Sequence, residues 1–139
     1  MEFNFKHFEN GLGQIYCSIR YRKRLRTVTV TWKGTAQLSG LEVVKDAVLE
    51  MIHQKKALFL VNDFQELFSG ASEILVHFLE MGWDNEIHDA GLRFVIHIWK
   101  EGFELPPLSD KGAAFIRLCP SKLDANAWIE KHLKTMPAH

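Results

Sequence analysis

Residues 57–63 read ALFLVND, a short and continuous apolar run that closes on two polar residues. A second run of this kind, LRFVIHIW, occupies residues 92–99. The length of both runs and their Phe, Val and Ile favour strands over helices. Strands that are apolar at nearly every position are typical of parallel sheets with both faces covered by helices. These two runs therefore predict an α/β fold.

On the N-terminal side, the sequence predicts a hairpin and then a helix. IYCSIRY (15–21) and LRTVTVTWKG (25–34) alternate as strands do, and only Arg22 to Arg24 separates them, so they should pair antiparallel. Further along, apolar residues recur every three or four positions, which marks an amphipathic helix. They are Leu38, Leu41, Val44, Val48, Met51 and Ile52. Residues 1–14 mix aromatic and polar groups, and we expect a loosely ordered lead-in there.

On the C-terminal side, a long helix is predicted over residues 71–89, with Gly91 closing it. Pro106 and Pro107 make residues 102–112 a loop. AAFIRLC (113–119) is a strand, and Ser121 caps a last helix. The apolar face of that helix is formed by Ala125, Trp128, Ile129 and Leu133.

The predicted order is β-β-α-β-α-β-β-α. It gives one domain over residues 1–139, with a mixed, mostly parallel sheet of about five strands and helices covering it.

Composition excludes several classes of protein. Lys plus Arg and Asp plus Glu both number 17, so the net charge is zero, which argues against nucleic acid as the main partner. No apolar run approaches the roughly 18 residues of a membrane span, and the N-terminus has no signal-peptide pattern. The two cysteines, Cys17 and Cys119, each lie in a strand-like stretch and are expected to be reduced and buried. We expect a cytoplasmic protein.

Four stretches carry a resemblance to a known family. They are VTVTWKG (28–34), FLVND (59–63), AGLRFVI (90–96) and ANAWIEKHL (125–133). In this order they resemble the STAS domain of anti-sigma-factor antagonists, in particular small bacterial SpoIIAA-like proteins, with a distant link to CRAL-TRIO lipid-transfer domains. The resemblance implies a non-enzymatic regulatory or protein-interaction module.

The same resemblance directs attention to the turn before the long helix. In the family, an Asp-Ser-(Ser/Thr)-Gly turn carries a phosphorylated residue there. Here the turn reads ELFSGASEIL (66–75), without an Asp before the serines. If a phosphate switch exists in this chain, Ser69 or Ser72 carries it, since a helix N-terminus stabilises a phosphate. The alternative, which we favour, is that one of them caps the helix.

The predicted helix over 71–89 is apolar over most of its circumference. A surface helix needs a narrower apolar face, so the excess must meet a second copy or a ligand, or be covered by the N-terminal segment or the proline loop. We expect a homodimer, with Phe78 and Trp83 as anchors. The remaining stripe has metal-like spacing, but a solvated stripe explains it better and no metal is expected. It consists of Glu73, His77, Glu80, Asp84 and His88.

The remaining candidates are single residues and one cluster. The basic run RYRKRLR (20–26) is either a grip for an anionic partner or, as we favour, a solvated hairpin tip. His97 is expected as a hydrogen-bonded core residue. Asp63, at the end of its strand, either holds a loop or lines a pocket. No catalytic set can be assembled, and no cofactor is expected.

The rival function is a small module that binds a lipid or fatty acid. The resemblance to lipid-transfer domains places such a guest between sheet and helix, near Phe64, Phe68, Trp83 and Trp99.

Overall fold

The computed structural model describes residues 4–35, 38–80, 82–99 and 115–136. Their strands form one sheet in sequence order. The strands are β1 (Phe5–Glu9), β2 (Ile15–Arg22), β3 (Thr27–Thr35), β4 (Phe59–Ser69), β5 (Phe94–Ile98) and β6 (Phe115–Cys119). β1, β2 and β3 pair antiparallel, whereas β3 to β6 pair parallel. The predicted mixed α/β fold is confirmed, with six strands rather than about five.

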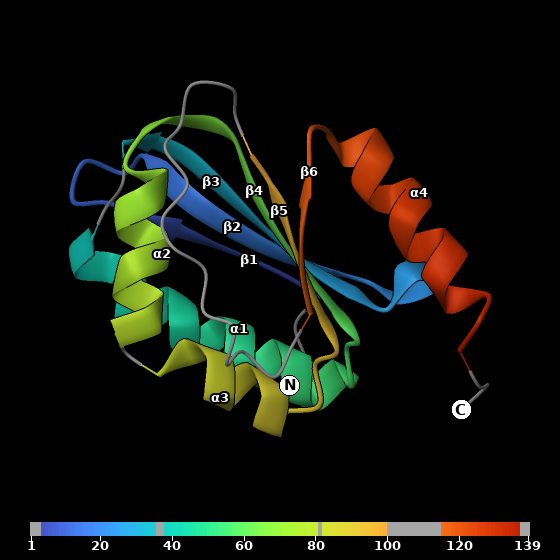
Figure 1. The fold of residues 1–139 in the computed structure, drawn as a ribbon. Helices are drawn as coiled ribbons and strands as arrows, with labels where there is room; N and C mark the ends of the chain where they lie inside the picture. The colour runs from blue at the N-terminus through green and yellow to red at the C-terminus, as the bar shows by residue number, and fades with distance from the viewer. Residues whose placement is uncertain (1–3, 36–37, 81, 100–114, 137–139) are drawn as a thin grey trace.

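Helices lie on both faces of this sheet (Figure 1). α1 (Leu41–Lys55), α2 (Ala71–Glu80) and α3 (Trp83–Asp89) cover one face, and α4 (Lys122–Leu133) packs on the other. There are also two short 3₁₀ turns in the described ranges: η1 (Lys23–Leu25) follows β2, and η2 (Leu38–Gly40) precedes α1. None of the helices in these ranges is long and apolar enough to cross a membrane.

The two faces hold separate hydrophobic cores. The larger core joins β2, β3 and β4 to α1, α2 and α3, and includes Val28, Trp32, Phe64 and Phe78. The smaller core lies under α4, where Ala125 and Ile129 pack on Phe59 and Val61. The apolar face predicted for α4 is confirmed, as is its Ser121 cap, whose Oγ accepts a hydrogen bond from Asp124 N at 3.2 Å.

The N-terminal segment differs from the expected loose lead-in. Residues 5–9 form an edge strand that pairs with β2, with Phe5 opposite Arg20 and Phe8 opposite Cys17. Phe8 is buried and contributes to the larger core. Phe5 and Phe8 stand three positions apart among polar residues, so they do not show the alternation typical of a strand. The backbone pairing with β2, which the local sequence does not show, makes this segment a strand.

The prediction of one long helix over 71–89 is wrong in one respect, because the helix is broken at Gly82. Gly82 has a φ of 77°, in the left-handed region that a helix cannot contain, and α3 starts directly after it. A glycine adopts this conformation without steric cost, so the chain can turn there. Gly91, with a φ of 99°, ends the second helix as predicted.

β4 is longer than the predicted strand 57–63. Its second half stays paired with β3, with Lys33 opposite Glu66 and Thr35 opposite Ser69, after an irregularity in the register. Asp63 therefore lies in the middle of a strand and not at its end.

Candidate functional site

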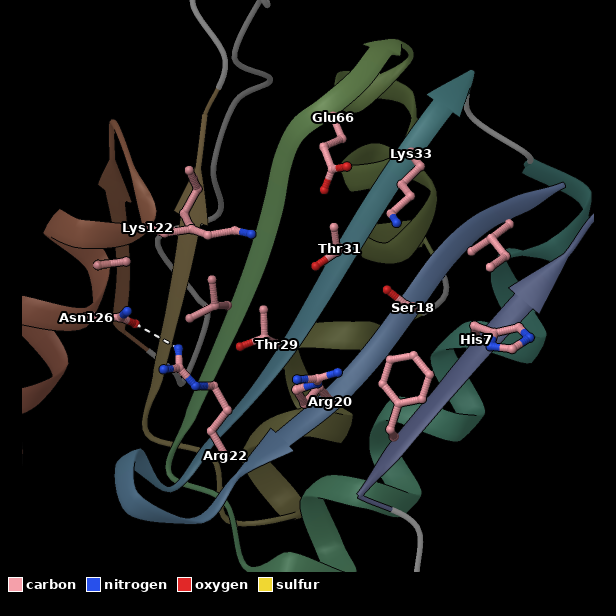
Figure 2. Close-up of a pocket in the computed structure, with 15 residues that line it drawn as sticks. His7, Ser18, Arg20, Arg22, Thr29, Thr31, Lys33, Glu66, Lys122 and Asn126 are labelled. Atoms are coloured by element: carbon pink, nitrogen blue, oxygen red, sulfur yellow. Dashed lines mark hydrogen bonds between the residues drawn. The ribbon is translucent and has the colours of Figure 1, made fainter.

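A hollow of about 530 Å³ lies on the sheet face that carries α4. α4 packs on β4, β5, β6 and η1, and the hollow extends beside it over β1, β2 and β3. Figure 2 shows its side chains standing on one face of these strands, with α4 along one side. We call it the basic hollow.

Strand alternation gives the basic hollow its polar floor. In β2, Cys17 and Ile19 enter the larger core, so the alternate residues Ser18, Arg20 and Arg22 face the hollow. In β3, Val28, Val30 and Trp32 are buried, while Thr29, Thr31 and Lys33 face the hollow. The two-residue alternation that directs apolar side chains of β2 and β3 into the core thus also directs their polar side chains into the hollow.

The charge of the basic hollow is positive. Four cationic side chains line it: Arg20, Arg22, Lys33 and Lys122. Glu66 is the acid in the lining, and the carboxylate of Asp63 reaches Lys122. The chain as a whole is neutral, so this face concentrates positive charge locally.

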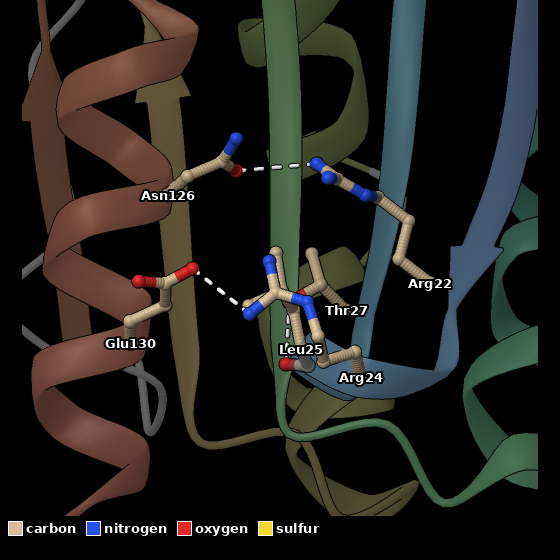
Figure 3. A network of polar contacts seen from close by, with 6 residues as sticks. All are labelled: Arg22, Arg24, Leu25, Thr27, Asn126 and Glu130. Carbon is tan, nitrogen blue, oxygen red and sulfur yellow. Dashed lines mark hydrogen bonds and ion pairs between the residues drawn. The ribbon is translucent and has the colours of Figure 1, made fainter.

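The hairpin between β2 and β3 contacts α4 directly (Figure 3). Arg24 forms an ion pair with Glu130 at 2.9 Å, and Arg22 donates to Asn126 Oδ1 at 3.2 Å. The basic run 20–26 is therefore more than the solvated tip that the sequence favoured. The side chains of this run point to different places: Arg20 and Arg22 line the hollow, whereas Arg24 of η1 contacts α4.

Asp63 is fully buried and pairs with α4. Its Oδ1 accepts a hydrogen bond from Gln65 N at 3.0 Å, and its Oδ2 lies 3.4 Å from Nζ of Lys122. Among the residues that the structure describes, Oδ2 accepts no hydrogen bond. Asp63 therefore serves as a buried counter-charge for Lys122 at the edge of the basic hollow.

His97 belongs to a polar chain inside the larger core. Trp32 Nε1 donates to Asn62 Oδ1 at 3.3 Å, and Asn62 Nδ2 lies 3.4 Å from His97 Nδ1. Burial lowers the pKa of His97 to about 4, so the ring is neutral at physiological pH. The prediction of a hydrogen-bonded core histidine is confirmed.

The predicted serines lie around the start of α2. Ser69 is exposed and ends β4, whereas Ser72 is half-buried in the first turn of α2. The carbonyl of Gly70 accepts the first helical bond, from Ile74 N at 3.0 Å, so Gly70 takes the cap position that was predicted for a serine. Phe68, beside Ser69, is 75% exposed.

The predicted aromatic anchors lie inside the protein. Phe78 and Trp83 are buried and stack at 5.0 Å between ring centroids, and Phe78 also contacts Trp32. Phe64 packs on Trp32 and Trp99. Phe78 and Trp83 are therefore covered by aromatic residues of the chain itself, whereas Val76 of α2 is 40% exposed. The proline loop that was expected as one possible cover lies outside the described residues.

The metal-like stripe is divided by the break at Gly82. Glu73, His77 and Glu80 belong to α2, and His88 belongs to α3. Within residues 4–35, 38–80, 82–99 and 115–136, no group of three His, Cys, Asp or Glu residues could hold a metal ion.

Sequence reasoning did not find the basic hollow. Its signal was present in the alternation of Thr29, Thr31 and Lys33 along a strand whose other face is apolar. What the sequence could not show is that no helix in the described part of the chain packs over that polar face.

One comparison with known proteins bears on the fold. A solved structure of the anti-sigma factor antagonist SpoIIAA in its unphosphorylated form matches with a TM-score of 0.55. The match covers 82% of this chain and 97% of that chain, at 14% sequence identity. No protein-family model and no curated protein matches the chain. At this identity the likeness establishes the fold, and the expected SpoIIAA-like fold of the STAS domain is confirmed.

Proposed function

We propose that this chain is a non-enzymatic regulatory module that acts by binding another protein. The observation that carries the proposal is the shared fold with an anti-sigma factor antagonist. A fold hosts many functions, so the surface of this chain must supply the rest of the argument.

That surface lies where β3 and β4 end. Thr35 pairs with Ser69, so the segments that follow both strands start at the same end of the sheet, where open α/β folds place their binding sites. η2 contacts α2 at this end. Two large apolar side chains are exposed on elements at this end, Leu38 of η2 and Phe68 of β4, and together with Ser69 they define the strand-end surface. Exposed apolar residues of this size favour a protein partner.

The candidate chemical groups elsewhere are engaged inside the protein. His97 faces Asn62 and Asp63 faces Lys122. Burial of Cys17 raises the pKa of its thiol, which makes it a poor nucleophile. These contacts support a role without catalysis, and two free buried cysteines fit a reducing compartment such as the cytoplasm.

Site-specific photo-crosslinking in the native cell tests the proposal. A photoreactive phenylalanine analogue would replace Phe68 in one protein and, as a control, Leu123 in another. Leu123 is 80% exposed on α4, away from the strand-end surface. We expect a discrete protein adduct from position 68 alone. Equal adducts from both positions, or none from position 68, would contradict the proposal.

A phosphate switch at Ser69 or Ser72 remains a prediction within this function. Both residues are close to the free N–H groups of α2, although Glu73 in the same turn would repel a phosphate. Incubation with cell lysate and ATP, followed by mass spectrometry, would locate any phosphate. The Ser69→Asp, Ser72→Asp double variant should weaken the crosslink at position 68 if the switch operates.

The predicted homodimer and the lipid-binding alternative also remain open to test. Phe64, Trp83 and Trp99 pack on other aromatic side chains, as residues of a solid core do. Phe68 is largely exposed and so does not line an interior lipid site with them. Sedimentation at micromolar concentration would reveal a dimer. Native mass spectrometry of the freshly purified protein would reveal a co-purified lipid, and such a lipid would favour the alternative.

A further inference from the structure

We propose that the basic hollow binds a small phosphorylated molecule. It uses residues other than the strand-end surface, so the inference is independent of the proposed function.

The first argument is uncompensated charge. In the described ranges, no carboxylate lies within the 4.0 Å of an ion pair from Arg20, Arg22 or Lys33. Arg20 lies over the ring of Phe5 at 5.1 Å, and Arg22 donates to the neutral Asn126. Arg20 and Arg22 face the hollow two residues apart on β2, whereas Glu66 lies opposite Lys33 on the neighbouring strand. The two arginines therefore carry charge that no acid in the lining neutralises, and an anion placed beside them would do so.

The second argument is the set of donors. Arg20 and Arg22 present guanidinium groups, which bind oxyanions with two parallel hydrogen bonds. The hydroxyls of Ser18, Thr29 and Thr31 stand between these arginines and Lys33 on the same sheet face (Figure 2). Each hydroxyl can donate to one further oxygen of the anion.

The third argument is size. Small-molecule sites span about 300–1,000 Å³, and the hollow measures about 530 Å³. One carboxylate needs a single cation, whereas a phosphate carries close to two charges and three acceptor oxygens. Several cations with interleaved hydroxyls therefore favour a phosphate over a carboxylate.

The floor supports the groups that would bind. Thr29, Thr31 and Lys33 lie on β3, a strand paired on both sides, by β2 and by β4. Asn126, which accepts from Arg22, lies on α4. Groups placed on regular elements in this way lose little conformational freedom when a ligand binds.

The test is an NMR titration of the intact ¹⁵N-labelled protein with inorganic pyrophosphate, with calorimetry for affinity. We expect amide shifts in β2, β3 and the first turns of α4, and none in α1. The Arg20→Gln, Lys33→Gln double variant should bind about tenfold more weakly or worse, since each lost charged hydrogen bond is large. Lys122 is left intact in this variant because it also pairs with Asp63.

The matched control is the Lys23→Gln, Lys134→Gln double variant. It removes the same charge from exposed positions that do not line the hollow, and it should bind as tightly as the parent chain. An equal loss of affinity in both variants would show that binding depends only on the overall charge of the protein, and this would overturn the proposal. The absence of shifts in β2 and β3 at millimolar pyrophosphate would overturn it too. Citrate binding as tightly as pyrophosphate would refute the phosphate assignment.

Discussion

Trp32 Nε1 donates to Asn62 Oδ1 across 3.3 Å, and this bond determines where the proton of His97 sits. An indole nitrogen can only donate, so the amide oxygen of Asn62 must face Trp32. The amide nitrogen of Asn62 then faces His97 Nδ1, at 3.4 Å, and that ring nitrogen must accept. His97 is therefore neutral, with its proton on Nε2. A chain of three buried side chains on β3, β4 and β5 thus has one consistent set of donors.

The first prediction concerns acid stability. The pKa of His97 is lowered to about 4 by burial, against an ordinary 6.5. Above pH 6.5 both folded and unfolded chains hold a neutral ring, and this group adds no pH dependence. Between pH 6.5 and 4 only the unfolded chain takes up the proton, so the free energy of unfolding falls as the pH falls. The total loss is about 3 kcal/mol.

Denaturant unfolding at a series of pH values measures this loss. The His97→Asn variant keeps an acceptor near the position of Nδ1 but cannot titrate, so its stability should depend less on pH across this window. Parallel curves for the variant and the parent chain would contradict the assignment.

The second prediction separates a core from an interface. Phe78 is buried against Trp32 and Trp83, so Phe78→Ala should lower the free energy of unfolding by about 3–5 kcal/mol. Phe68→Ala should change it by less than about 0.5 kcal/mol, because that ring is 75% exposed. Chemical denaturation measures both. If Phe78→Ala altered sedimentation without loss of stability, Phe78 would be an interface anchor instead.

The third prediction concerns Asp63 and Lys122. Lys122→Met leaves the buried carboxylate without its cation and should cost about 1–3 kcal/mol. Lys122 is the first residue of α4, where a positive charge opposes the helix dipole, so the dipole alone predicts a gain. In an Asp63→Asn background the same change should cost little. A loss of equal size in both backgrounds would show that the two charges are not coupled.

The fourth prediction concerns whether Gly82→Ala raises or lowers the stability of the protein. If residues 71–89 formed one continuous helix, Gly82→Ala would stabilise the protein by about 1 kcal/mol. With the φ of 77° found here, alanine is strained and should destabilise it by about 1–2 kcal/mol. A Cβ at this position would meet no atom within 4 Å, so crowding does not confuse the result. Thermal unfolding of the parent chain and of the Gly82→Ala variant shows whether residues 71–89 form one continuous helix or two helices.

The sequence by itself determined the elements whose period is local. The alternation of β2 and β3, the apolar face of α4, the Ser121 cap and the Gly91 terminus depend on neighbours a few residues away. The order of these elements then implied a mixed sheet with helices on both faces, because parallel strands require crossovers. Glycine within a helical pattern was a weaker signal, since a helix tolerates it, and the break at Gly82 was missed for that reason.

Only the tertiary structure decided what each face meets. Phe78 and Trp83 carry the same apolar surface whether a second copy or the chain's own Trp32 covers it, and no local pattern distinguishes the two. Asp63 was expected at a strand end because the sequence could not show that β3 continues to pair with residues 66–69. The basic hollow arises because α4 packs over β4 to β6 and extends no further across the sheet. Strand alternation directs Arg20 and Lys33 to that face, but packing between distant segments decides whether a helix covers them.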